Sequence, residues 1–131
     1  MKLTSALALV FALPLFASGE EITFNEHVAP LIHKNCTECH RPGEAGPFAL
    51  ITYRDISKRA ATLNRVISER YMPPWHPVEV DGIQYAHSRK LSDAEIEMFA
   101  KWVEAGKPEG DPDKAPKPPE FPEGWQLGEP D

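Results

Sequence analysis

Apolar residues recur at spacings of three and four in three stretches of the chain, which is the pattern of amphipathic helices. The first stretch follows Thr23 and runs into Cys36. Thr23 and Glu26 have the spacing of a capping box, in which both side chains bind backbone N–H groups at a helix start. Pro30 is expected to bend this helix or to leave one carbonyl unpaired. The expected buried face consists of Phe24, Val28, Leu31 and Ile32.

The second predicted helix runs from about Thr52 to Arg70, with Thr52 and Asp55 as its cap. It ends there because Pro73 and Pro74 cannot continue a helix. Its other face is basic and typical of a solvated surface. The predicted apolar face consists of Tyr53, Ile56, Ala60, Leu63 and Ile67.

The third predicted helix begins at Ser92, which forms a second capping box with Glu95, and ends at Gly106. Its expected buried stripe is Ile96, Phe99, Ala100 and Val103, flanked by Trp102. Seven of the 24 residues after Lys107 are proline, so residues 108–131 are expected to form an extended tail that wraps the domain or links to something else. With no strand-like alternation, the pattern predicts an all-α fold of three main helices.

Residues 1–19 have the features of a secretory signal peptide, because Lys2 precedes an apolar run from Ala6 to Phe16 and small residues follow it. The run is too short to persist as a membrane-spanning helix, so no membrane anchor is expected after cleavage. The mature protein is therefore expected to be periplasmic or secreted, with its folded domain in residues 20–107.

Length and charge narrow the function classes further. The 131 residues suffice for one small domain. The 14 basic and 20 acidic side chains give a net charge of −6, which argues against binding to nucleic acid because that requires a basic face. The two cysteines exclude a scaffold of several disulfides.

The strongest chemical signal is the sequence from Cys36 to His40, CTECH. A Cys-x-x-Cys-His sequence is the attachment site of c-type haem. The spacing lets the thiols of Cys36 and Cys39 add to the two vinyl groups of one porphyrin, and the adjoining His40 becomes an axial ligand of the iron. One covalent haem c per chain would use both cysteines.

Three other interpretations of the cysteine pair are less favoured. A redox-active dithiol is expected beside a βαβ pattern, which the sequence lacks. A zinc site needs four ligands at close spacing, whereas His76 and His87 are eleven residues apart. A structural disulfide across so short a span would be strained.

Met72 is the favoured second axial ligand of the iron. It follows the second predicted helix, Pro73 and Pro74 fix the backbone beside it, and a soft sulfur ligand raises the reduction potential. Met98 is expected to pack within the third helix instead. His76 is the competing ligand, since it lies four residues further along the same rigid segment. The remaining histidines, expected at the surface or in hydrogen bonds, are His27, His33 and His87.

With CxxCH near the N-terminus, Met72-Pro73-Pro74 later and a capped C-terminal helix, the chain resembles the class I cytochromes c. A narrower group is similar over residues 22–131: haem modules of exported bacterial proteins, often joined to a copper, ascorbate-dependent monooxygenase-like domain. The similar segments are CHRPGEAGPFALITY, MPPWH, LSDAEI, WVEAGKPEGD and GWQLGEP.

This resemblance implies a small cytochrome c-like fold, with three main helices around one covalently bound haem. The N- and C-terminal helices are expected to cross where Phe24 or Val28 meets Phe99 or Trp102. In that family a proline carbonyl accepts a hydrogen bond from the proximal histidine, and Pro47 matches it here. Candidates to hydrogen-bond the haem propionates are Tyr53, Arg54, Tyr71 and Trp75.

An iron with both axial positions filled has no site for a substrate. The protein is therefore expected to carry single electrons through the exposed haem edge, between redox protein partners that dock transiently, rather than to act as an enzyme. The acidic charge favours a partner with a basic patch. The alternatives are an open-site haem protein, such as a peroxidase or gas sensor, and a haem module that serves a separate copper oxidoreductase.

Overall fold

The computed structural model describes residues 21–75, 77, 80–83, 85–86 and 88–122. The signal sequence predicted for residues 1–19 lies outside this part of the chain. Within it every regular element is a helix and no residue lies in a β-strand, which confirms the all-α prediction. None of the described helices combines the length and the apolar character needed to cross a membrane. The elements are η1 (Phe24–Val28), α1 (Ala29–Asn35), α2 (Tyr53–Ser57), α3 (Ala60–Ser68), α4 (Asp93–Glu104) and η2 (Pro112–Lys114).

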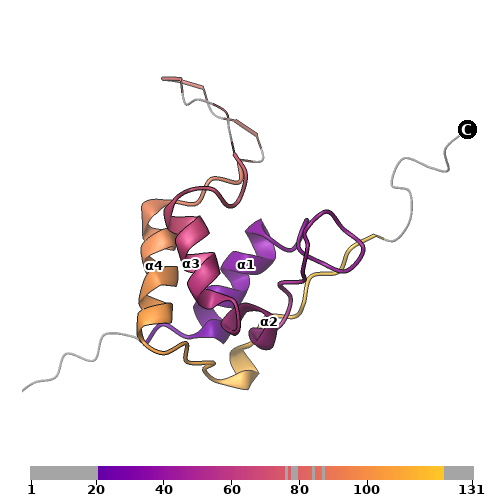
Figure 1. The fold of residues 1–131 in the computed structure, drawn as a ribbon, viewed down its shortest axis with the longest axis vertical. Helices are drawn as coiled ribbons and strands as arrows, with labels where there is room; N and C mark the ends of the chain where they lie inside the picture. The colour runs from indigo at the N-terminus through magenta and orange to yellow at the C-terminus, as the bar shows by residue number, and fades with distance from the viewer. Residues whose placement is uncertain (1–20, 76, 78–79, 84, 87, 123–131) are drawn as a thin grey trace, which may run out of the picture.

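The helices pack around one apolar core. In Figure 1, α1 and α3 run in the same direction, and α4 runs in the opposite direction beside α3. The ring of Phe24 lies 6.2 Å from that of Trp102, so η1 meets the C-terminal part of α4 as the resemblance implied. The largest core side chains with almost no exposure are Trp102, Phe99, Ile32, Leu50, Ile56 and Val28.

The start of the first helix differs from the prediction. The Thr23 side chain makes no capping bond; its backbone N–H donates to His27 Nδ1 instead, 3.1 Å away. Glu26 forms an ion pair with Lys114 rather than closing a capping box. The first turn, η1, is a π-helix that continues directly into α1, and Pro30, which has no N–H to donate, lies just after their junction.

The second predicted helix is divided into α2 and α3. The Thr52–Asp55 capping box is present, and the predicted apolar face is buried from Ile56 to Ile67, with Tyr53 half-buried. The division occurs at Arg59, whose guanidinium donates to the Asp55 carbonyl. In a continuous helix that carbonyl would accept the N–H of Arg59, which bonds to the Ile56 carbonyl instead.

The third helix was predicted more accurately. Ser92 and Glu95 form the expected capping box, and Phe99 is fully buried. Trp102 was expected to flank the buried stripe, but it lies at the centre of the core with no exposed surface. Its Nε1–H donates to the Pro108 carbonyl at 3.0 Å, so the indole also fixes the start of the tail.

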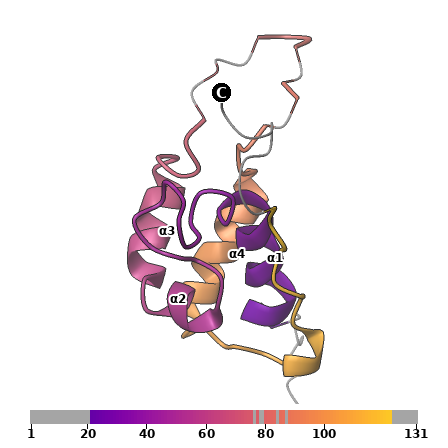
Figure 2. The same ribbon diagram turned by 90° about the vertical axis from the view of Figure 1, so that its right-hand side faces the viewer.

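The described part of the tail, residues 108–122, wraps the domain. The backbone N–H groups of Phe24 and Asn25 donate to the carbonyls of Pro108 and Glu109 at 2.9 and 3.0 Å. From η2 the chain passes beside α1, as Figure 2 shows. At its far end the Phe121 ring stacks on the Arg41 guanidinium, 3.9 Å from the ring centroid.

Candidate functional site

The CxxCH segment adds one further helical turn to α1. Cys36 is the C-cap of α1, and the His40 N–H donates to the Cys36 carbonyl at 2.9 Å. Residues four apart in such a turn lie on the same side, which brings Cys36 and His40 together. The fully buried Thr37 holds the turn, because its hydroxyl donates to the His33 carbonyl at 2.6 Å.

Both cysteines and His40 line one cavity of about 240 Å³, which we call the motif cavity. Met72 lines it from another segment, the one that follows α3. Glu38 and Arg89 lie at its edge, where they form an ion pair of 2.7 Å. Its apolar walls are Ile32, Leu50, Leu63 and Ile67, together with Pro47, Pro73 and Pro74. The structure thus brings together four of the predicted site residues that matter most, Cys36, Cys39, His40 and Met72.

The His40 ring has a defined orientation. Its Nδ1 lies 3.2 Å from the Phe48 carbonyl oxygen. A carbonyl only accepts, so Nδ1 carries the hydrogen and Nε2 keeps its lone pair free for a metal. Pro47 was expected to supply this carbonyl; the acceptor is the next residue, Phe48, while Pro47 lines the motif cavity.

The loop after His40 closes tightly on its ring. The Gly46 N–H donates to the Cys39 carbonyl at 2.7 Å. A Cβ added at Gly46 would lie 2.6 Å from that carbonyl oxygen and 2.7 Å from His40 Nδ1. On another side the Phe48 ring lies 5.0 Å from the imidazole, and the Arg59 guanidinium covers the Phe48 ring at 4.4 Å. Only glycine fits at position 46 without moving the ring.

The environment of Cys36 bears on the chemistry of the pair. Burial, and secondarily the neighbouring Cys39, raises the pKa of the Cys36 thiol to about 12. Nucleophilic Cys-x-x-Cys thiols lie at helix N-termini, where the helix dipole lowers their pKa. Cys36 lies at the C-terminal end of α1, where the helix dipole does not lower the pKa of a thiol, so its raised pKa disfavours dithiol exchange. A neutral thioether suits the same position because it buries no charge.

Met72 also lines a second cavity of about 210 Å³, the rim cavity, which shares Ile67, Met72 and Pro73 with the motif cavity. Trp75 lies in the rim cavity, its ring 6.0 Å from that of Tyr85. Met98 lines neither cavity and packs against the hydrophobic core, as expected. The competing ligand His76, like His87, lies outside the described residues.

The other sequence candidates lie away from the cavities. His27 Nδ1 accepts the Thr23 N–H one turn away, and His33 Nε2 lies 3.0 Å from the Ile51 carbonyl oxygen. The Tyr53 hydroxyl donates to the Lys107 carbonyl at 2.8 Å. Tyr71 is largely exposed, and neither it nor Arg54 lines the motif cavity or the rim cavity.

The sequence analysis missed three basic residues at the cavities. Arg89 lines the motif cavity, and Arg70 and Lys90 line the rim cavity. Basic side chains bind carboxylates, and two of these already do so within the chain, Arg89 with Glu38 and Arg70 with Asp93. The only available signal was the basic pair at positions 89 and 90 just before the capped helix, and nothing in the sequence linked it to Cys36.

Within the described residues no three His, Cys, Asp or Glu side chains gather closely enough to hold a metal ion. Haem iron takes four ligands from its porphyrin, so it needs only one or two side chains. No protein-family model matches the chain, and no curated protein or solved structure is significantly similar to it.

Proposed function

We propose that this chain is an exported c-type cytochrome that carries one covalently attached haem and transfers single electrons. One observation supports it above all. The two thiols of the CxxCH sequence, its histidine and Met72 line one cavity with apolar walls, although Met72 is 32 residues beyond His40 in the chain. This is the donor set of a histidine–methionine haem.

The surroundings of these donors fit the group. The apolar walls suit a porphyrin face, and the basic side chains of Arg89 and Lys90 suit its propionates. The hydrogen bond from His40 Nδ1 leaves Nε2 as the free donor. The protonated Cys36 thiol can become a thioether with no charge left behind. These features support a cytochrome c-like arrangement of the helices around the cavity.

When bound, haem supplies an iron that gains and loses one electron. The residues of the chain determine how easily that occurs. His40 would hold the iron through Nε2, and the contact of its Nδ1 with the Phe48 carbonyl would make the imidazole a stronger donor. Met72 offers a soft sulfur that favours the reduced ion. Leu50, Leu63 and Ile67 exclude water from the same space, which disfavours the extra positive charge of the oxidised ion.

Ligation from both His40 and Met72 favours electron transfer over an enzymatic role, since no position is left for a substrate. Electron exchange would occur at the exposed edge of the cavity with a redox protein that docks weakly. The open-site alternative, a peroxidase or gas sensor, requires Met72 to leave the iron. The other alternative, a haem module that serves a separate copper oxidoreductase, differs only in the redox partner. The haem site would be the same.

The deciding experiment is intact mass spectrometry of the exported protein. We expect the polypeptide mass after signal cleavage plus the mass of one haem, and a pyridine haemochrome spectrum typical of two thioether bonds. Cys36→Ser and Cys39→Ser should each remove one thioether, and the double variant should lack covalent haem. A bare polypeptide mass from cells that assemble other c-type cytochromes would contradict the proposal.

The axial ligand has its own readout. A low-spin ferric spectrum with a weak sulfur-to-iron charge-transfer band is expected, and Met72→Ala should remove that band. Met98→Ala is the matched control and should leave it unchanged, because Met98 lines neither cavity. A high-spin spectrum of the unmodified protein would favour the open-site alternative, and a sulfur band that persists without Met72 would exclude Met72 as the ligand.

A further inference from the structure

Arg70 adopts a backbone conformation that ordinarily belongs to glycine. Its φ of 56° lies in the left-handed region, where a Cβ is unfavourable. Helices commonly end with such a residue just after the last turn, and glycine is the usual choice. Arg70 follows α3 in that way. Glycine would be less strained at this position, so the presence of an arginine indicates that its side chain has a function.

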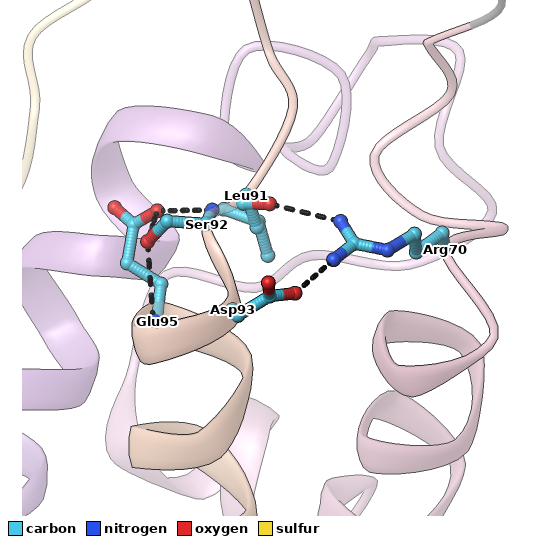
Figure 3. Close-up of polar contacts among 5 residues, drawn as sticks. All are labelled: Arg70, Leu91, Ser92, Asp93 and Glu95. Carbon is cyan, nitrogen blue, oxygen red and sulfur yellow. Dashed lines mark hydrogen bonds and ion pairs between the residues drawn. The ribbon is translucent and has the colours of Figure 1, made fainter.

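The guanidinium of Arg70 joins the end of α3 to the start of α4. Its Nη1–H donates to the Leu91 carbonyl at 3.1 Å, and its Nη2–H donates to the Asp93 carboxylate. Figure 3 shows the side chain reaching both groups at once. Leu91 precedes the N-cap of α4, and Asp93 is its first residue, so both contacts hold the same turn.

The turn at the start of α4, to which Arg70 donates, is itself held by hydrogen bonds. The Ser92 N–H and hydroxyl both lie 2.8 Å from the Glu95 carboxylate, and the Glu95 N–H returns a bond to the Ser92 hydroxyl (Figure 3). The Leu91 side chain is buried in the core. Arg70 therefore ties the segment after α3 to a fixed point.

Met72 comes two residues after Arg70. Its N–H and that of Tyr71 both donate to the Val66 carbonyl, at 3.0 and 2.9 Å. On one side the segment is thus held to α3 by backbone bonds, and on the other to α4 by the Arg70 side chain. Arg70, Leu91 and Met72 all line the rim cavity.

We propose that Arg70 is a positioning residue for Met72 as the axial ligand of the haem iron. The inference rests on the proposed function, because it assumes that Met72 binds the iron. Arg70 acts through the backbone and does not touch the metal. Arg70 holds the segment that carries Met72 in place before the haem binds. The iron–sulfur bond then has less conformational freedom to restrict, so the bond is stronger.

The test measures how easily an external ligand displaces Met72. Imidazole is titrated into the ferric protein, full chain and haem-loaded, and its dissociation constant is compared among variants. Arg70→Gly keeps the left-handed backbone without strain but removes the tether. We expect imidazole to bind about threefold to tenfold more tightly to it, from the loss of one charge-assisted hydrogen bond and one exposed ion pair. The sulfur-to-iron band should weaken in parallel.

Two further variants separate positioning from a general effect on folding. Asp93→Asn changes α4 instead of the segment after α3, and it keeps the contact between Arg70 and the Leu91 carbonyl. It should tighten imidazole binding about twofold. Arg70→Lys retains the charge but not the two-pronged geometry and should give an intermediate value. Arg65→Ala is the matched control, since it removes another ion pair of α3, with Glu69, on an exposed face. It should leave imidazole binding unchanged.

The outcomes for the two proposals are distinct. If Met72→Ala abolishes the sulfur band but Arg70→Gly and Asp93→Asn bind imidazole like the unmodified protein, the positioning role is wrong and the proposed function stands. If the unmodified protein shows no covalent haem or no sulfur band, the ligand assignment fails first and Arg70 has no ligand to position.

Discussion

The two ends of the helical bundle are held together by different interactions. At one end, η1, α2 and the C-terminal part of α4 close on each other through aromatic rings, and the tail covers the junction. We call this the closed end; Phe24 there lies 5.3 Å from the Tyr53 ring and 6.2 Å from that of Trp102. At the other, open end, α1, α3 and the first turn of α4 contribute side chains to the motif and rim cavities. There the chain segments are held by backbone hydrogen bonds, by the Arg70 side chain and by the close approach of Gly46 to the His40 ring.

The difference shows that this fold separates stability from ligand placement. Apolar packing at the closed end is complete within the polypeptide, so its residues should determine the free energy of unfolding. The open end leaves space between apolar walls, so its residues should determine what fills that space and in which geometry. Substitutions at the two ends should therefore alter different measurements.

The largest loss of stability is expected from Trp102→Ala at the closed end. The fully buried indole leaves a large cavity and the Pro108 carbonyl loses one of its two donors, so unfolding should become easier by about 3–5 kcal/mol. Chemical denaturation measures it. Trp75→Ala at the open end is the matched control and should cost far less, because Trp75 is only half-buried. Equal losses would mean that the two ends are not energetically distinct.

Gly46→Ala should disturb the open end most. The new methyl group would lie within 2.8 Å of the Cys39 carbonyl and the His40 ring, so the loop or the imidazole must move. We expect a cost of about 1–3 kcal/mol and an altered spectrum of the haem-loaded protein. Gly43→Ala is the control: it also strains a turn, at φ 83°, but its Cβ meets nothing within 4 Å. If both variants change the spectrum equally, contact with His40 is not the cause.

Asn25→Ala tests the attachment of the tail to the closed end. The buried side-chain amide donates to the carbonyls of Gly110 and Asp111, at 3.4 and 2.9 Å. Its loss should cost about 1–3 kcal/mol and speed proteolysis after Lys107, while the haem spectrum stays unchanged. Asn64→Ala provides the comparison, because Asn64 Oδ1 accepts no hydrogen bond from the described residues. An unaffected tail in Asn25→Ala would show that other contacts suffice.

The smallest effect is expected at the cap of α2. Burial acts to raise the pKa of Asp55, but hydrogen bonds from Thr52 and the charge of Lys58 outweigh it and hold the pKa below its ordinary value. A lowered pKa means that the carboxylate stabilises the fold above its unfolded pKa, and that this is lost as the pH falls through the folded pKa. Asp55→Asn should therefore cost about 1 kcal/mol at neutral pH and little in acid. Denaturation curves at both pH values measure this, and an equal cost at both would exclude the carboxylate as its source.

The core helices could be predicted from the sequence because their signals are local. The spacing of Leu63 and Ile67 and the Ser92–Glu95 box each lie within one or two helical turns. The errors arose where a side chain outside the periodic pattern competed for a partner. Lys114 takes Glu26 from the expected capping box, and the guanidinium of Arg59 takes the Asp55 carbonyl and divides the second helix. Side-chain alternatives of this kind leave no periodic trace in a sequence.

The residues of the candidate site could be predicted where they are adjacent in the sequence, and could not where the fold brings them together. Cys36, Cys39 and His40 form one short motif, and Met72, which lines the same cavity, was predicted as a ligand from the prolines beside it. The carbonyl partner of His40 was placed one residue early, because a turn that contains Gly46 and Pro47 does not reveal which carbonyl faces the ring. Arg89 could not be found, since its place at the motif cavity depends on where α4 begins in space.

The bonds between the tail and η1 impose an order on folding. Asn25 and its partners Gly110 and Asp111 are 85 and 86 residues apart, so these contacts cannot form until nearly the whole chain has been made. A chain synthesised from its N-terminus presents Cys36 and Cys39 well before residue 110 arrives. Contacts of long sequence range also form late for reasons of loop entropy. Any chemistry at the two thiols can therefore begin before the tail is in place, and both cysteines remain only half-buried once the bundle has closed.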